Sequence, residues 1–246
     1  MHRTIVWLTW RQIFANRRLY LAMLFSLAPV VIALLFRSFS ADPEKESRGF
    51  YLLLAPDIVL GVLLPLSALV FGTTAFGGEI DDGTLLYLLV KPVKRWRIVI
   101  SKYVVAVLST FLLMLPAIFL PWLAVSAPDL PISIPVAYVW GAALGAILYG
   151  AFFTMLGAAV KHPLVIGLMY IVIIEEALAR SIAGVKALSI REFATAFSLR
   201  MADSSLNLGT PLVSASNMKV MGTLFLVGSL ALALYRLARY EMAEKP

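Results

Sequence analysis

Residues 103–128, YVVAVLSTFLLMLPAIFLPWLAVSAP, form a run of apolar residues without one charged side chain. A helix that crosses the hydrocarbon core of a bilayer needs about 20 such residues. The run is long enough, and Pro121 interrupts it only near its end. The sequence therefore predicts a transmembrane helix at about residues 103–125.

The composition of the whole chain is also typical of a membrane protein. Hydrophobic residues make up 61% of the sequence and charged residues 14%, against about 25% charged in soluble domains. Five further runs resemble the first, and we predict an all-α integral membrane protein with a bundle of six transmembrane helices. The other five predicted spans are residues 19–36, 58–78, 136–160, 163–178 and 219–236. The 163–178 segment is the shortest, and it either crosses the membrane or re-enters it.

Basic residues are distributed unevenly between the two predicted sides of the membrane. Residues 1–18, 79–102, 161 and 236–246 contain 13 of the 21 basic residues but only five of the 14 acidic ones. Loops on the cytoplasmic side are enriched in Lys and Arg. We therefore predict a multi-pass protein of the cell (cytoplasmic) membrane, with both termini cytoplasmic.

Several classes of chemistry find no support in this sequence. It contains no cysteine and only two histidines, His2 and His162, which excludes disulfides and thiolate zinc sites. We expect no catalytic, cofactor-binding or metal-binding residue. The net charge of +7 is attributed to cytoplasmic Lys and Arg beside anionic membrane lipid, and not to binding of nucleic acid.

The N-terminal residues 3–18 have an apolar side and a polar side when drawn as a helix. Val6, Trp7, Trp10, Ile13 and Phe14 fall on one arc. Tryptophan beside arginine suits a helix that lies in the plane of the membrane surface. We expect an amphipathic interfacial helix here, and the alternative is a plain extension of the first span.

The loop at residues 79–102 is the most informative polar segment. Its acidic residues precede a short leucine-rich run and its basic residues follow it, an order that complements a helix dipole. Thr84 is a suitable N-cap and Pro92 ends the run. A helix of about two turns is unstable alone, so its apolar side packs either on the membrane domain of this chain or on another protein.

The spacing Glu79-x3-Gly83-Thr84-x7-Pro92-x2-Arg95-x6-Lys102 resembles the first cytoplasmic loop of ABC-2 type permeases. These are the membrane subunits of one class of ATP-binding cassette (ABC) transporters. The order of the elements is also similar: an interfacial helix, two spans, this loop and four spans. The resemblance implies a coupling helix between spans 2 and 3 that contacts a separate ATPase. The positions that it assigns to ATPase coupling are Glu79, Gly83, Thr84, Leu88, Leu89, Pro92, Arg95 and Lys102.

The function implied by this resemblance is transport, and not covalent catalysis. The chain would be a permease subunit that moves an unidentified substrate, with export favoured over import. Two copies of a cytoplasmic ATPase would bind ATP and Mg, and a second copy of this chain would complete a homodimer. The alternatives are a secondary carrier, for which Asp57, Glu175 and Glu176 are the ionisable candidates, and a membrane-embedded enzyme without a recognisable motif.

The segment after the fifth predicted span is expected on the external side. Residues 179–217 resemble the re-entrant or interfacial segment that follows the fifth span in this family. Glu175 and Glu176 are expensive at the membrane edge unless they are solvated or paired. They line either a transport pathway or its outer gate, or else they pair with Arg180 or cap a helix, and deep burial would favour the first alternative.

Overall fold

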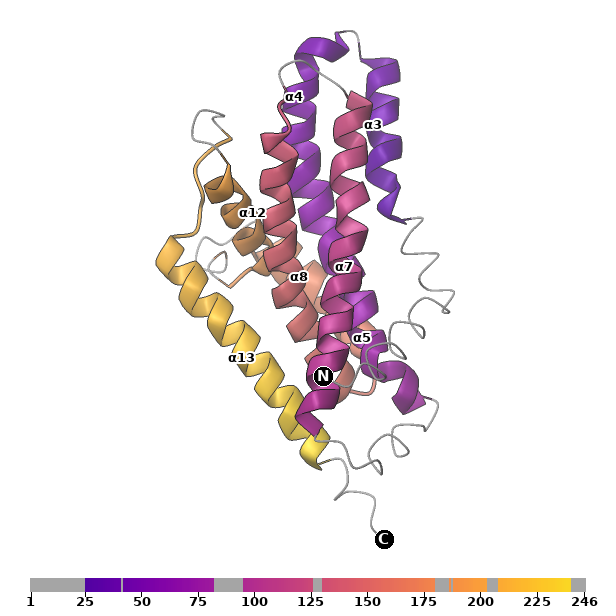
Figure 1. Ribbon diagram of the computed structural model, residues 1–246, viewed down its shortest axis with the longest axis vertical. Helices are drawn as coiled ribbons and strands as arrows, with labels where there is room; N and C mark the ends of the chain where they lie inside the picture. Colours follow the sequence, from indigo (N-terminus) through magenta and orange to yellow (C-terminus); the bar gives the residue numbers. More distant parts are fainter. Residues whose placement is uncertain are drawn as a thin grey trace.

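The computed structural model describes residues 25–40, 42–81, 95–125, 130–179, 186, 188–202 and 208–239. Within these ranges every regular element is a helix (Figure 1). The predicted interfacial helix at 3–18 lies outside the described residues. The same is true of five of the predicted coupling residues, namely Gly83, Thr84, Leu88, Leu89 and Pro92.

Ten helical elements follow one another along the described chain, and two of them, labelled η, are π-helical. They are α3 (Ala28–Phe39), α4 (Pro43–Leu53), η1 (Leu54–Leu63), α5 (Leu64–Asp81), α7 (Arg95–Val125), α8 (Ser133–Ala159), α9 (Pro163–Met169), η2 (Tyr170–Leu178), α12 (Ile190–Met201) and α13 (Ala215–Arg239).

Four of the described helices are long and apolar enough to cross a membrane. They are Lys45–Phe76, Arg95–Val125, Ser133–Ala159 and Ala215–Leu237. The helix at α3 is apolar but has only 12 residues. The all-helical architecture is thus confirmed, whereas the count of six spans is not.

The helix from α4 to α5 changes its winding in the middle. Its π-helical part, η1, contains Pro56 and is followed by Pro65, which is the second residue of α5. Proline has no N–H to donate, so the α-helical hydrogen-bond ladder loses a donor at both positions. Helices bend or change winding at such sites, and here the change places Asp57 within η1.

Helix α8 lies at the centre of the bundle and packs against α5, α7, α12 and α13 (Figure 1). Its small residues allow these close approaches. A Cβ added at Gly141 would lie 2.5 Å from the backbone oxygen of Ala194. One added at Gly145 would lie 2.4 Å from Leu64 Cδ2. The two glycines therefore serve helix packing within this chain, between α8, α12 and the start of α5.

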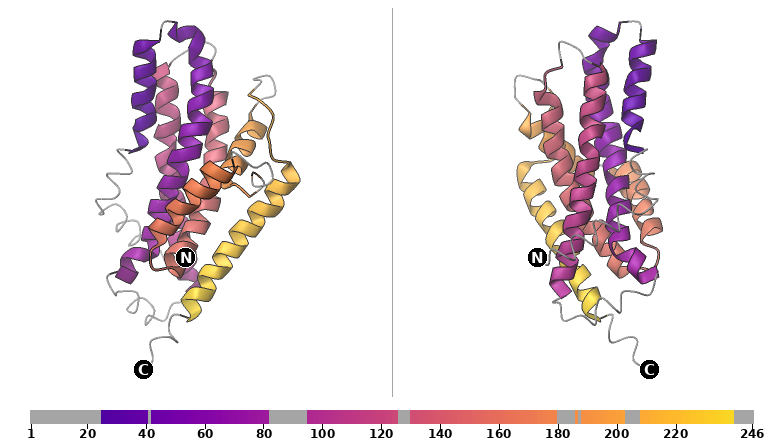
Figure 2. Two further views of the ribbon diagram at one scale, coloured as in Figure 1. Left: turned by 180° about the vertical axis from the view of Figure 1, so that it is seen from behind. Right: turned by 45° about the vertical axis from the view of Figure 1, so that its right-hand side comes forward.

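Large apolar side chains face outward from several helices of the bundle. Helix α13 runs obliquely along its side (Figure 2) and exposes Val220, Leu224 and Val227. Helix α3 exposes Val31 and Leu34 in the same way. Outward apolar side chains of this kind are suited to contact with lipid tails.

Candidate functional site: a polar cluster at two π-helical segments

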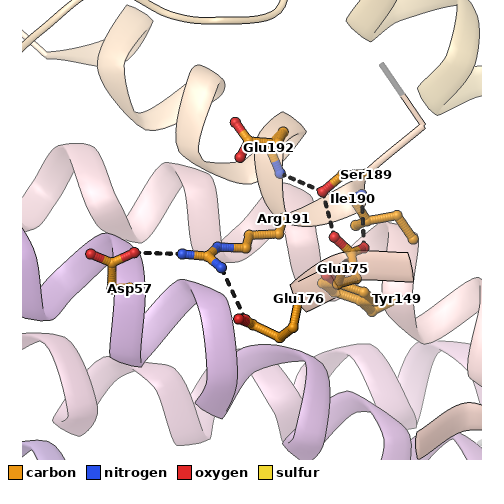
Figure 3. Close-up of polar contacts among 8 residues, drawn as sticks. All are labelled: Asp57, Tyr149, Glu175, Glu176, Ser189, Ile190, Arg191 and Glu192. Atoms are coloured by element: carbon orange, nitrogen blue, oxygen red, sulfur yellow. Dashed lines mark hydrogen bonds and ion pairs between the residues drawn. The ribbon is translucent and has the colours of Figure 1, made fainter. Parts of the chain in front are cut away.

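Arg191 joins the two π-helical segments to the start of α12 (Figure 3). Its Nη2 lies 2.6 Å from Asp57 Oδ1 in η1, and its Nη1 lies 2.9 Å from Glu176 Oε1 in η2. The Arg191 side chain is 9% exposed, whereas Asp57 is 52% exposed and Glu176 is 31% exposed. The cation is thus the enclosed member of the cluster, and the two anions face partly outward.

Gly61 provides the surface on which the guanidinium group of Arg191 lies. A Cβ added at Gly61 would be 2.8 Å from Arg191 Cζ and 2.9 Å from Nε. Gly61 follows Asp57 by four residues, so it lies about one helical turn further along the same helix. The missing side chain at this position therefore leaves the space in which Arg191 reaches Asp57.

Glu175 occupies a more enclosed place beside this ion-pair cluster. The residue is 1% exposed. Its carboxylate accepts hydrogen bonds from Tyr149 Oη at 2.9 Å, Tyr170 Oη at 3.2 Å, the backbone N–H of Ile190 at 3.0 Å and Ser189 Oγ. These four donors come from α8, η2 and the start of α12, so Glu175 fastens three parts of the chain together.

The start of α12 explains why a carboxylate lies there. Ser189 is the N-cap, and its Oγ accepts a hydrogen bond from the backbone N–H of Glu192 at 3.1 Å. The first N–H groups of a helix have no partner within the helix and carry partial positive charge. Glu175 accepts a hydrogen bond from one of them, the N–H of Ile190. It therefore caps a helix, which is part of the second alternative that the sequence offered for the two glutamates.

Pairing with Arg180 stays a prediction, because Arg180 lies outside the described residues. Among the described cations, Arg191 forms an ion pair with Glu176. Glu175 is deeply buried, the condition under which the sequence favours a functional role. Ionisable groups enclosed in a membrane protein are costly unless paired, and they often mark transport pathways. The role of Glu175 and Glu176 as a pathway or outer gate stays a prediction.

The sequence alone does not single out Arg191, Ser189 or Tyr149 as residues of this cluster. One local signal was available, because Ser189 and Glu192 have the spacing of a capping box and thereby predict the start of a helix. No spacing rule connects Arg191 with Asp57, which is 134 residues away. That contact depends on the tertiary packing of α12 against η1.

Three of the predicted coupling residues can be placed, and two of them, Lys102 and Arg95, contact other helices of this chain. Lys102 is 1% exposed. Its Nζ donates a hydrogen bond to the carbonyl oxygen of Ala75 in α5 and lies 4.8 Å from the ring centroid of Phe76. Arg95 Nη1 lies 3.4 Å from the carbonyl oxygen of Leu237 in α13. Glu79 lies in the last turn of α5.

The ion pairs of Arg191 and the hydrogen bonds of Glu175 together form one polar cluster. It does not have the composition of a metal site. Among the described residues, no group of three or more His, Cys, Asp or Glu is arranged to hold a metal ion. The donors around Glu175 are hydroxyl and N–H groups, and the carboxylates of Asp57 and Glu176 meet a guanidinium group. This arrangement joins η1, η2, α8 and the start of α12 through ion pairs and hydrogen bonds.

Comparison with known proteins adds one result. The model of a protein family described as ABC-2 family transporter protein matches residues 15–182. That range includes the loop at 79–102 and both glutamates of the polar cluster. No curated protein matches the chain in sequence.

Proposed function

Because the chain belongs to the ABC-2 family of transporter proteins, we propose that it is the permease subunit of an ABC exporter. The match covers residues 15–182, more than half of the chain, and it is the observation that carries this proposal. The long apolar helices support the same conclusion, since they are suited to crossing a membrane. ATP hydrolysis then belongs to a separate subunit, and this chain performs no covalent chemistry.

The second part of the proposal concerns the partners. Two copies of a cytoplasmic ATPase bind ATP and Mg, and two copies of this chain form the membrane part. The loop at 79–102 docks into the ATPase on the cytoplasmic side, where both termini also lie. The asymmetry of basic residues between the two predicted sides supports this orientation.

The positions of Arg95 and Lys102 suggest how movement of the loop reaches the membrane. Lys102 contacts α5 and Arg95 contacts α13. Movement of the start of α7 is then passed to both helices through these contacts. In this proposal the two residues act inside the permease, while Leu88 and Leu89 meet the ATPase.

The third part places a gate at the polar cluster. Glu176 lies at the partly exposed side of the cluster and Glu175 at its enclosed side. Both precede the segment that is expected on the external side. Rearrangement of the helices around these two glutamates opens the pathway toward the outside.

The experiment that tests the proposal is purification of the chain together with its ATPase in mild detergent. We expect a complex with two copies of each subunit by native mass measurement, and ATP hydrolysis that responds to added transport substrates. A chain that carries a substrate without any ATPase, in response to an ion gradient alone, would contradict the proposal and favour a secondary carrier.

A further inference from the structure

Arg191 forms ion pairs with both π-helical segments, with Asp57 in η1 and with Glu176 in η2. We propose that Arg191, Asp57 and Gly61 form a latch, a contact that is closed in this structure and opens when α4 and η1 move away from α12. The proposal deepens the proposed gate and rests on the proposed function for its consequence in transport. Opening of the latch exposes the interior of the bundle at this end.

The contacts of Glu175 identify the part of the cluster that stays together. Its carboxylate accepts four hydrogen bonds and is enclosed. Separation of η2 from α12 would leave several donors without partners, away from water, and that loss is costly. Segments η2, α8 and α12 therefore move as one unit.

The contact between Arg191 and Asp57 can separate at a lower cost. Asp57 is 52% exposed, so water can replace the guanidinium group at its carboxylate. Arg191 keeps its second ion pair with Glu176 when Asp57 leaves. The enclosed cation is thus never left without an anion, which would be strongly unfavourable. This asymmetry distinguishes a latch from a contact that only stabilises the fold.

The packing next to η1 provides a pivot for the movement. A Cβ added at Gly145 of α8 would touch Leu64 Cδ2 at 2.4 Å and Ala194 Cβ at 3.3 Å. The first residue of α5 and the middle of α12 thus meet α8 at one point. Pro65 follows at once and interrupts the hydrogen-bond ladder. Segments α4 and η1 can swing about this point while α5 stays packed.

Gly61 allows the latch to be tested by shape alone. The substitution Gly61→Ala leaves every charge in place and raises intrinsic helix propensity. Its Cβ would lie 2.8 Å from Arg191 Cζ, so the guanidinium group has to leave its place. If the latch holds α4 and η1 against α12, this substitution weakens it in the same way as removal of the Asp57 charge.

The measurement is a distance between spin labels on α4 and α12, on the full chain in lipid nanodiscs. The sequence contains no cysteine, so Gly49→Cys and Met201→Cys provide unique sites. A Cβ at Gly49 would have no atom within 4 Å, and Met201 is 48% exposed. In the parent chain we expect one short distance, with any longer distance in a minor state of up to about 10%.

In Asp57→Asn and in Gly61→Ala we expect the longer distance to gain several-fold in population. Glu192→Gln, which removes a charge next to Arg191 on the same helix, should leave the distribution unchanged.

Thermal unfolding of each labelled protein shows that it is folded. If both latch variants unfold at lower temperature but keep the parent distances, Arg191 only stabilises the fold and the latch is wrong. Both measurements use the chain alone, so failure to find an ATPase partner would overturn the proposed function and leave the latch standing.

Discussion

The ammonium group of Lys102 in α7 donates a hydrogen bond to the carbonyl oxygen of Ala75 in α5. Helices α5 and α7 are the two that flank the predicted coupling loop, so this contact joins the two ends of the loop within the bundle. Lys102 is 1% exposed. The family resemblance assigns Lys102 to coupling, and its enclosure leads us to propose that it acts by positioning the loop rather than by contacting the ATPase directly.

Lys102→Met should separate coupling from folding. Methionine keeps an unbranched apolar side chain of similar length and avoids the cost of enclosing a charge, which offsets the loss of the hydrogen bond to Ala75. We expect the unfolding temperature to stay close to that of the parent chain. The yield of cross-linking from Leu88→Cys to the ATPase should fall several-fold. Lys161→Met, at an exposed lysine, is the control, and equal yields in the two variants would show that Lys102 does not position the loop.

The adjacent residues Glu175 and Glu176 should differ strongly in their effect on stability. Glu175→Ala leaves four hydrogen-bond donors without their acceptor in an enclosed place. We expect a loss of about 3 kcal/mol or more in the free energy of unfolding. Glu176 is 31% exposed, and Glu176→Ala should cost about 1 kcal/mol or less. Unfolding in mixed micelles with a denaturing detergent measures both, and equal losses would contradict the different roles of the two glutamates.

Two glycine-to-alanine substitutions should act in opposite directions. A Cβ at Gly141 would lie 2.5 Å from the backbone oxygen of Ala194, and backbone cannot move aside as a side chain can. Gly141→Ala should therefore destabilise the chain by about 1–3 kcal/mol. A Cβ at Gly228 in α13 would have no atom within 4 Å, so Gly228→Ala should be neutral or stabilise by up to about 1 kcal/mol. The same unfolding assay compares the two variants. If Gly228→Ala destabilised the chain and Gly141→Ala did not, the packing of α12 on α8 would be contradicted.

Periodicity and composition predict the all-helical architecture because an apolar run of about 20 residues has few stable alternatives in a bilayer. They predict the ends of the helices less well. The sequence places the second span at 58–78, whereas the structure has one helix from Pro43 to Asp81. The charge of Asp57 ends the apolar run in the sequence, but the helix continues through this residue.

The polar cluster was predictable only in part. Glu175 and Glu176 stand out because they interrupt an apolar run. Their partners do not stand out, since Tyr149 lies within a long apolar helix and Arg191 lies in a segment of mixed polarity. Gly61 is one of 15 glycines, and only the three-dimensional packing identifies it as the place where Arg191 lies. Contacts between distant segments follow from packing, which no local pattern in one sequence encodes.

The orientation of the chain can be tested with single cysteines, since the sequence has none. Gly49→Cys is exposed on α4, in the segment between the first two predicted spans and therefore on the predicted external side. It should react with a membrane-impermeant thiol reagent in intact cells. Thr84→Cys should react only after the membrane is opened, because the basic residues around it favour the cytoplasmic side. Labelling of Thr84→Cys in sealed cells would overturn the predicted topology and, with it, the site proposed for the ATPase.

The coupling loop itself gives the last prediction. Thr84–Lys91 is a short leucine-rich segment between acidic and basic residues, and a helix of this length needs a partner to be stable. If that partner is the ATPase, Leu88→Asp places a charge in an apolar interface. A well-buried interface residue contributes about 2 kcal/mol, so the Kd for the ATPase should rise about 30-fold. The control Asp82→Asn should mainly change the association rate and its salt dependence.

Both variants should insert and unfold like the parent chain, because the substitutions lie outside the apolar helices. If Leu88→Asp instead lowers the unfolding temperature and leaves ATPase binding unchanged, the segment packs on its own membrane domain, and the ATPase docks elsewhere.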